Sequence, residues 1–294
     1  MKCRVCQERA VIAVPRHNAA FCRVHFQEFF KKQVQRAIGQ HRMFKRDERV
    51  LVCVSGGKDS LVLWQVLTEL GYDTTGLYID LGIKEYSERS KTLAMKASER
   101  LKKPLIVKEF SQQWGPIAEV ARLGGRTDCS ACGTVKRYYF NRVAIEGGFD
   151  VVATGHNLDD EAARLLGNLL RWQWEYLGRI TPVLEEGEGL RKKVKPLCRL
   201  TEHEIATYAF LNRIEYIVEE CPMSRGSTSL LYKDALNRIE LKSPGTKHYF
   251  YQEYLRSAVQ RFRAVSCIQG RRCRECGMPS VDELCSFCRL TSRY

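Results

Sequence analysis

The chain has 294 residues, of which 44% are hydrophobic, so it can bury a core and does not have the composition of a disordered tail. At about 100–200 residues per domain, this length predicts one catalytic domain with small appendages. The 48 lysines and arginines exceed the 34 aspartates and glutamates, and the net charge of +14 favours nucleic acid as a partner, although a membrane surface would also attract it. Because no signal-peptide core opens the chain and no apolar run is long enough to cross a bilayer, we expect a cytoplasmic protein without a membrane partner.

Residues 1–30 are predicted to form a cysteine-rich module that leads into a helix. In a reducing compartment, the thirteen cysteines of the chain indicate metal ligation or sulfur chemistry rather than disulfides. Here Cys3-x2-Cys6 is followed after fifteen residues by Cys22-x2-His25. Two residues between ligands let a tight turn present both side chains to one tetrahedral ion, and four protein ligands leave no position for a reacting water. We therefore predict a structural zinc ion.

The next segment, residues 31–220, is predicted to be the catalytic domain. Apolar strands are expected at 50–54, 75–79, 105–107 and 151–154, and helices at 59–70, 86–102 and 133–146. This βαβ alternation predicts an α/β fold with a doubly wound parallel sheet and helices on both faces.

A glycine-rich loop follows the first of these strands. It reads Ser55-Gly56-Gly57-Lys58-Asp59-Ser60. Two glycines let the backbone turn sharply and point N–H groups at phosphate oxygens, the following helix adds its positive end, and the lysine and second serine add a charge and a hydroxyl. The loop does not match the Walker pattern, so hydrolysis of a γ-phosphate is not indicated.

The SGGKDS loop after a strand resembles the PP-loop of the N-type ATP pyrophosphatases. Members of that superfamily cleave ATP between its α and β phosphates and adenylate a substrate oxygen. The resemblance implies that residues 55–60 bind ATP with Mg²⁺, that Asp59 takes part in catalysis, and that the backbone around Val54 and Ile79 reads the adenine edge. Cys53 would offer ATP only its backbone.

A second motif, Gly155-His156-Asn157-Leu158-Asp159-Asp160, leaves the strand at 151–154 and opens a helix. Doubly wound sheets bind ligands at these carboxyl ends of strands. The pattern G-H-x-x-D-D is similar to that of the tRNA-modifying branch of the superfamily, which favours Gly155 for nucleotide binding and Asp160 for a catalytic or magnesium-related role. Either aspartate could instead cap the helix. Asp80, after the strand at 75–79, is equally a turn residue or a nucleotide contact.

Three further cysteines lie inside the catalytic segment, as Cys129-x2-Cys132 and Cys221-Pro222. The pair alone could bind metal, form a redox disulfide or carry a persulfide. Three thiolates without a fourth protein ligand suit a [4Fe–4S] cluster, whose uncovered iron could hold sulfide, although spacing alone does not bring the third cysteine to the pair. The remaining thiols, Cys198 and Cys267, are interpreted as core residues or free thiols, like Cys53.

Residues 221–265 are predicted to be a helical tRNA-binding region, with two helices that meet near Pro244-Gly245. Cations and aromatics mix between Lys247 and Arg263, and such groups bind phosphates and stack on unpaired bases. The same aromatics at helical spacing could instead be core. Residues 266–294 are predicted to form a second structural zinc module, whose ligands are Cys273, Cys276, Cys285 and Cys288. Arg271, Arg272 and Arg274 beside it add to the basic surface.

Over nearly its whole length the chain resembles the tRNA 2-thiouridine synthetases of the TtuA type, in which two zinc modules flank a PP-loop domain with C-x-x-C and a distant Cys-Pro. The resemblance implies that ATP adenylates O2 of a tRNA uridine, expected at position 54 of the T loop, and that sulfur held at the cluster replaces it. It makes Cys129, Cys132, Cys221 and Asp160 catalytic, and assigns Lys136, one helical turn past Cys132, to ATP phosphate or the adenylated intermediate. A ubiquitin-like protein with a C-terminal thiocarboxylate would supply the sulfur, and a homodimer is expected.

Three alternatives stay open at this point. A wobble-uridine tRNA thiolase shares the zinc modules, and sequence barely separates the two. A PP-loop RNA ligase, as in lysidine formation, would give no task to the three internal cysteines. A zinc-bearing RNA-binding protein with a degenerate nucleotide site would not need the intact loop.

Overall fold

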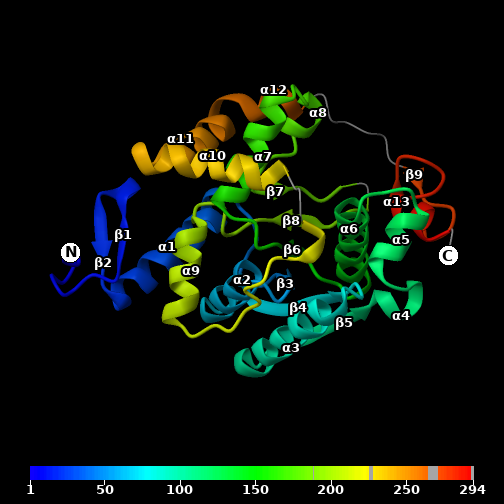
Figure 1. Ribbon diagram of the computed structural model, residues 1–294, viewed down its shortest axis with the longest axis horizontal. Coiled ribbons are helices and arrows are strands. Elements are labelled where there is room, and N and C mark those ends of the chain that lie inside the picture. Colours follow the sequence, from blue (N-terminus) through cyan, green and yellow to red (C-terminus); the bar gives the residue numbers. More distant parts are fainter. Residues whose placement is uncertain (188, 225–227, 264–270, 293–294) are drawn as a thin grey trace.

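The computed structural model describes residues 1–187, 189–224, 228–263 and 271–292. Its centre is a six-stranded sheet in the order β5-β4-β3-β6-β8-β7, in which neighbours are parallel except β7 with β8 (Figure 1). The strands of this sheet are β3 (Arg49–Cys53), β4 (Asp73–Asp80), β5 (Leu105–Glu109), β6 (Val151–Ala153), β7 (Val183–Leu184) and β8 (Lys192–Val194). The strand order reverses between β3 and β6, the point at which doubly wound sheets bind ligands. The predicted fold class is confirmed.

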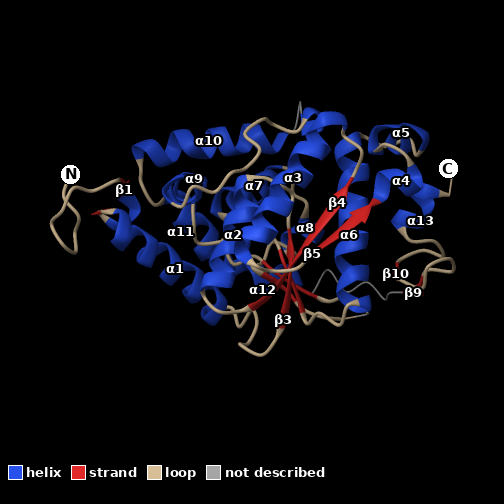
Figure 2. Ribbon diagram, turned by 90° about the horizontal axis from the view of Figure 1, so that it is seen from below, coloured by secondary structure: helices blue, strands red, loops and turns tan. Residues whose placement is uncertain are grey.

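Helices surround this sheet (Figure 2). Those of the central domain are α1 (Arg23–Gln40), α2 (Lys58–Glu69), α3 (Lys84–Leu101), α4 (Phe110–Trp114), α5 (Ile117–Leu123), α6 (Asp128–Glu146), α7 (Leu158–Leu170), α8 (Trp174–Leu177) and α9 (Glu202–Leu211). None of the described helices is both long and apolar enough to span a bilayer.

Both faces of the central strand β3 are buried, which explains why its sequence is apolar without alternation. Val50 and Val52 face one core, together with Trp64 of α2 and helices α1 and α9. Leu51 and Cys53 face the other core, together with helices α5 and α6. The sheet therefore fixes the loop that follows β3 between two packed layers.

The helix that carries the internal cysteine pair begins earlier than expected. We predicted a helix over 133–146, whereas α6 starts at Asp128, with the extended residue Thr127 at its N-cap. A threonine followed by an aspartate is a helix-start signal that the sequence does contain. As a result, Cys129 and Cys132 lie in the first turns of α6 rather than in a loop.

The C-terminal helices pack on α7 and α8. They are α10 (Thr228–Lys242), α11 (Thr246–Glu253), a π-helical turn (Tyr254–Ala258) and α12 (Val259–Arg263), and the short 3-10 helix η2 (Pro222–Ser224) precedes them. Gly245, with φ of +98°, makes the turn between α10 and α11 at the place where the sequence predicted one.

The two cysteine-rich ends lie at opposite ends of the molecule (Figure 1). Strands β1 (Ile12–Val14) and β2 (Ala19–Phe21), joined by the 3-10 turn η1 (Pro15–His17), form a hairpin before α1, while β9 (Arg271–Arg272) and β10 (Pro279–Ser280) precede α13 (Ser286–Thr291). Arg16 pairs with Glu204 of α9 at 2.7 Å, with both side chains buried. The ring of Phe287 stacks on Tyr138 of α6 with centroids 3.7 Å apart. Each end is therefore fastened to the central domain.

Candidate active site

The phosphate loop joins β3 to α2 and is held by its own hydroxyl groups. The Ser55 backbone N–H donates to Ser60 Oγ at 3.1 Å, and Ser60 Oγ donates to the Gly57 carbonyl at 2.9 Å. Gly56 has φ of +74°, and a Cβ atom on it would lie 2.7 Å from Cα of Ser90. The loop is thus kept turned at the N-terminus of α2, where the first N–H groups of a helix attract phosphate.

A second loop, which follows β6, lies directly against the phosphate loop. A Cβ atom on Gly155 would lie 2.9 Å from the backbone nitrogen of Ser60, so glycine permits this approach. Asn157 Nδ2 donates to Asp59 Oδ1 at 3.3 Å, and Lys58 Nζ pairs with the same oxygen at 2.7 Å. The two segments predicted to bind nucleotide are therefore in contact.

A cavity of about 190 Å³ opens at the end of β3 and β4. It brings together seven of the predicted site residues, which are Cys53, Val54, Ser55, Ile79, Cys132, Lys136 and Cys221. Leu81, Ile83, Tyr86 and Phe140 supply most of its apolar wall. The chemistry of this lining suits a flat apolar ring beside a charged group, which is how an adenine nucleotide is built.

The three internal cysteines come close to one another in space, although the third is far away in the sequence. Ile217 N–H donates to the Gly56 carbonyl at 3.0 Å, which leads the chain past the phosphate loop toward Cys221. Cys129 Sγ donates to the Met223 carbonyl at 2.9 Å. Desolvation raises the pKa of Cys129, and the charges of Cys132 and Cys221 raise it further, so the three thiols are within electrostatic reach.

Asp160 lies at the start of α7 and is held in place by two kinds of contact. It forms a capping box with Asn157, whose side chain caps the helix, and it pairs with Lys233 Nζ of α10 at 2.6 Å. Burial alone would raise the pKa of Asp160, but the charges of Lys233 and His156 and the hydrogen bonds from Lys233 and the Asn157 backbone together outweigh burial and hold this pKa below its ordinary value. Asp160 is therefore an anion whose orientation is fixed.

The neighbouring acids of α7 are structural. Asp159, which we considered as a helix cap, instead forms a buried ion pair with Lys247 of α11. Glu161 is fully buried and pairs with Lys195 at 2.5 Å, and it also accepts a hydrogen bond from the Tyr251 hydroxyl at 3.2 Å. The three acids in series thus bind lysines from three different segments and lock the C-terminal helices onto the site.

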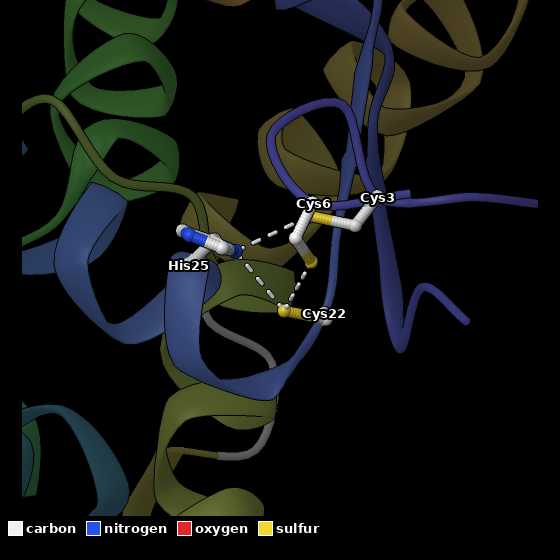
Figure 3. A group of neighbouring side chains, drawn as sticks. All are labelled: Cys3, Cys6, Cys22 and His25. Carbon is white, nitrogen blue, oxygen red and sulfur yellow. Dashed lines mark hydrogen bonds between the residues drawn. The ribbon is translucent and has the colours of Figure 1, made fainter. Parts of the chain in front are cut away.

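Two sets of ligand atoms suited to a single metal ion occur among the described residues, and both lie in the terminal modules. In each set the ligand atoms lie within 4.8 Å of one another, as Figure 3 shows for Cys3, Cys6, Cys22 and His25. Cys6 and Cys22 sulfurs are 3.7 Å apart, close to the about 3.8 Å that two thiolates on one tetrahedral zinc would have with Zn–S bonds of about 2.3 Å. The second set is Cys273, Cys276, Cys285 and Cys288.

Several further polar residues and thiols are not part of the cavity lining. Asp80 accepts the Gly82 N–H at 2.9 Å, which makes it a turn residue. His203 lies in the first turn of α9, and Cys198 is buried in the core on the α1 side of the sheet. Arg137 follows Lys136 on α6 but donates to Thr134 at 3.5 Å, and Cys267 lies outside the described residues.

The predicted RNA-binding stretch is divided between core and surface. Lys247, Tyr251 and Tyr254 are buried, so their side chains have no surface to offer an RNA, whereas Tyr249, Arg256 and Arg261 are exposed. The helical spacing of the aromatics is the same for a core face and for a binding face, which is why the sequence left both open. Seven residues of the cavity lining were not predicted, among them Tyr86 and Phe140, because nothing in their local sequence distinguishes these two from core aromatics.

The loop geometry and the doubly wound sheet define the class of PP-loop proteins. A family model described as a PP-loop domain matches residues 25–225, and a model of the N-terminal LIM domain of the 2-thiouridine synthetase TtuA matches residues 2–27. The tRNA-5-methyluridine(54) 2-sulfurtransferase of Thermus thermophilus is 47% identical over 99% of this chain and 91% of its own length, and that of Pyrococcus horikoshii is 43% identical over 99% and 93%. The chain therefore belongs to the TtuA-type 2-thiouridine synthetases.

A solved structure shares this architecture throughout. The U34-tRNA thiolase NcsA from Methanococcus maripaludis, determined with its [4Fe-4S] cluster, superposes with a TM-score of 0.81 at 26% identity and covers 99% of this chain and 96% of its own.

Proposed function

We propose that the protein is an ATP-dependent tRNA sulfurtransferase that replaces O2 of uridine 54 in the T loop by sulfur. The observation that carries the proposal is the single cavity shared by the end of the PP-loop strand, Lys136 and two of the three internal cysteines. The identity of 47% to a relative named for position 54, against 26% to the U34 thiolase, favours the T loop over the wobble base.

The proposed reaction has two transfers. In the first, O2 of the uracil attacks the α-phosphorus of ATP, an O–P bond forms, and the bond to pyrophosphate breaks. In the second, a sulfur nucleophile adds to C2, and the C2–O bond breaks with its electron pair leaving on AMP. The backbone N–H groups of the phosphate loop would hold the phosphates, and Lys136 would offset the negative charge that develops on them.

Asp160 would act at the first transfer. Its carboxylate is kept ionised by Lys233 and fixed by Asn157, so it can hold Mg²⁺ on the phosphates or orient the uracil. The Gly155 loop packs against the phosphate loop and leads into the first turn of α7, which carries Asp160. A nucleotide that orders the phosphate loop would therefore also fix the position of Asp160.

The donor set of the internal cysteines fits an iron–sulfur cluster better than a single ion. Among the described residues, the sets whose ligand atoms lie within 4.8 Å of one another are terminal, so Cys129, Cys132 and Cys221 are spread more widely than zinc ligands are. A cubane of four irons needs such a spread, and three thiolates leave one iron without a protein ligand. When bound, a [4Fe–4S] cluster would supply a site that holds the incoming sulfide.

The remaining partners follow from the same proposal. Structural zinc ions would occupy the two terminal ligand sets, and the basic chain would bind tRNA in the cytoplasm. A ubiquitin-like protein with a C-terminal thiocarboxylate would deliver the sulfur, and the active form would be a homodimer.

The experiment is nucleoside mass spectrometry of an unmodified tRNA after anaerobic incubation with ATP, Mg²⁺, a thiocarboxylate donor and the reconstituted protein. We expect a 2-thio nucleoside at position 54, and its loss in Cys132→Ser and Cys221→Ser. Cys198→Ser, at a buried thiol on the other side of the sheet, is the matched control. Thiolation at position 34, or joining of an amine instead of sulfur, would contradict the proposal.

A further inference from the structure

A group of exposed aromatic side chains lies where α7 ends and α8 begins, and the proposed chemistry does not use it. Trp172 is 66% exposed, Trp174 44% and Tyr176 55%, and all three fall within five consecutive residues. Large apolar side chains gathered in this way on a surface mark a binding site more often than chance exposure.

The two tryptophans are the outer end of a series of neighbouring rings, here called the aromatic ladder, made of Tyr254, Phe262, Trp174 and Trp172. The three inner rings stack, and the Trp172 ring is tilted by 37° to that of Trp174. Tyr254 is buried, and its hydroxyl donates to the Leu177 carbonyl at 2.5 Å. The Tyr254 and Phe262 centroids are 6.3 Å apart, Phe262 and Trp174 5.4 Å, and Trp174 and Trp172 4.8 Å. The ladder is thus anchored in the core and ends at an exposed ring.

The backbone of Trp172 has a strained, left-handed conformation. Trp172 follows the C-cap residue Arg171 of α7 and has φ of +50°, a conformation that glycine normally supplies at this position. The Gln173 N–H closes the helix end by donating to the Asn168 carbonyl at 2.9 Å. A bulky side chain in the left-handed region costs stability, and such strain gathers at functional sites.

Charge around the ladder favours an anionic partner. Arg171 and Arg179 lie on either side of the tryptophans in the sequence, both exposed, and the segment from 170 to 179 contains a single acid, Glu175. The guanidinium of Arg171 lies over the ring of Tyr232, near the N-terminus of α10, at 6.0 Å from its centroid. Cations beside open aromatic faces are the combination that holds single-stranded nucleic acid.

The ladder lies about one helix length from the place proposed for the reacting base. Asp160 is near the first residue of α7 and Trp172 just beyond its last, and a 13-residue helix is about 20 Å long at 1.5 Å per residue. RNA loops present several unstacked bases that aromatic side chains can bind, so a base other than the reacting one can meet the ladder at this distance.

We propose that the exposed face of Trp172 stacks on an unpaired base of the tRNA, about one helix length from the base that reacts. This inference rests on the proposed function and deepens it by placing a tRNA contact on the α7–α8 corner. The base extends the aromatic ladder by one ring, and Arg171 and Arg179 bind the adjoining phosphates.

The test measures tRNA affinity of the reconstituted protein at fixed salt. Loss of one base–aromatic stack predicts that Trp172→Ala weakens binding roughly 5- to 150-fold, while Trp172→Phe retains most of it. The slope of affinity against salt should not change, because no phosphate contact is removed. Phe210→Ala on α9, at an aromatic that is 81% exposed, is the matched control and should bind like the parent.

A second variant separates binding from folding. Trp172→Gly removes both the ring and the backbone strain, so its thermal unfolding midpoint should rise while its tRNA affinity falls as in Trp172→Ala. Unchanged tRNA affinity in both variants would overturn the inference. It would also be overturned if sedimentation showed that the variants dissociate a dimer while each protomer keeps its tRNA affinity, because the ladder would then be a contact between two copies of the chain. If the parent makes no 2-thiouridine but the Trp172 variants still lose tRNA, the proposed function fails and the stacking site stands.

Discussion

Gly56 is the residue at which the phosphate loop depends most directly on the absence of a side chain. Its φ of +74° is costly for any other residue, and a Cβ atom would meet the backbone of Ser90 at 2.7 Å. We expect Gly56→Ala to destabilise the protein by about 1–3 kcal/mol and to weaken ATP binding at least about 10-fold, because the loop must move.

Unfolding in urea and nucleotide titration would measure these two effects. Gly39→Ala is the matched control, because Gly39 lies in α1 and a Cβ atom there has nothing within 4 Å. In a helix this change should stabilise by about 0.5–1 kcal/mol. Equal behaviour of the two variants would show that the loop tolerates a Cβ.

Asp159 and Asp160 are adjacent in the sequence, yet the structure gives them different tasks. Asp159→Asn would leave Lys247 as a buried charge without its partner, and we expect a loss of about 3–5 kcal/mol in unfolding free energy. Asp160→Asn should cost about 1 kcal/mol or less, because Lys233 is also paired with Glu202.

The thiolation rates of the two variants should rank in the opposite way to their losses of stability. Asp160→Asn is expected to reduce the rate by at least about 100-fold, as is usual when a charge-positioning group is lost. Folded Asp159→Asn should keep most of its rate when measured below its unfolding temperature. An active Asp160→Asn protein would remove this carboxylate from the catalytic assignment.

At the scale of secondary structure, what the sequence could predict follows from how local each signal is. The strand before SGGKDS, the helix after it and the two terminal ligand sets are encoded within about thirty residues each, and such local patterns could be recognised. Cys221 lines the same cavity as Cys132, and the chain leading to it is held by a backbone hydrogen bond from Ile217 to Gly56, across most of the domain. No local pattern carries that information.

The same limit explains the residues that sequence analysis placed differently. Tyr251 is buried in the core, where its hydroxyl donates to Glu161, and a helical period alone does not say which partner covers a face. The lysine that fixes Asp160, Lys233, comes from α10 and was likewise invisible without the fold.

Helix α6 is the element that joins the cysteine site to the C-terminal module. It carries Cys129, Cys132 and Lys136, and Tyr138 on the same helix stacks on Phe287 of α13 with parallel rings. We expect Phe287→Ala to lower the unfolding free energy by about 3–5 kcal/mol and to lower the cluster content after reconstitution.

Phe287→Tyr should retain both, since it keeps the stacked ring. Guanidinium unfolding and the iron-to-protein ratio would report the two effects separately. If Phe287→Ala loses stability but binds iron normally, the C-terminal module supports the fold without supporting the site.

For the whole molecule, the two terminal modules are anchored through buried contacts rather than attached as free appendages. The Arg16–Glu204 pair fixes one to α9, and the Phe287–Tyr138 stack fixes the other to α6. Modules of this size cannot bury a core of their own, so a bound metal is expected to contribute directly to folding. Loss of the metal should therefore lower the stability of the molecule and not only of its ends.

Removal of zinc tests this argument. A strong chelator should release two zinc ions per chain and lower the thermal unfolding midpoint by several degrees. Acidification should release zinc as well, because cysteine binds zinc as a thiolate and acid protonates it to the thiol. Cys6→Ser should halve the zinc content, while Cys198→Ser, at a buried thiol outside both ligand sets, should leave it at two. Chelation that removes both ions without shifting the midpoint would mean that the side-chain contacts hold the ends in place without the metal.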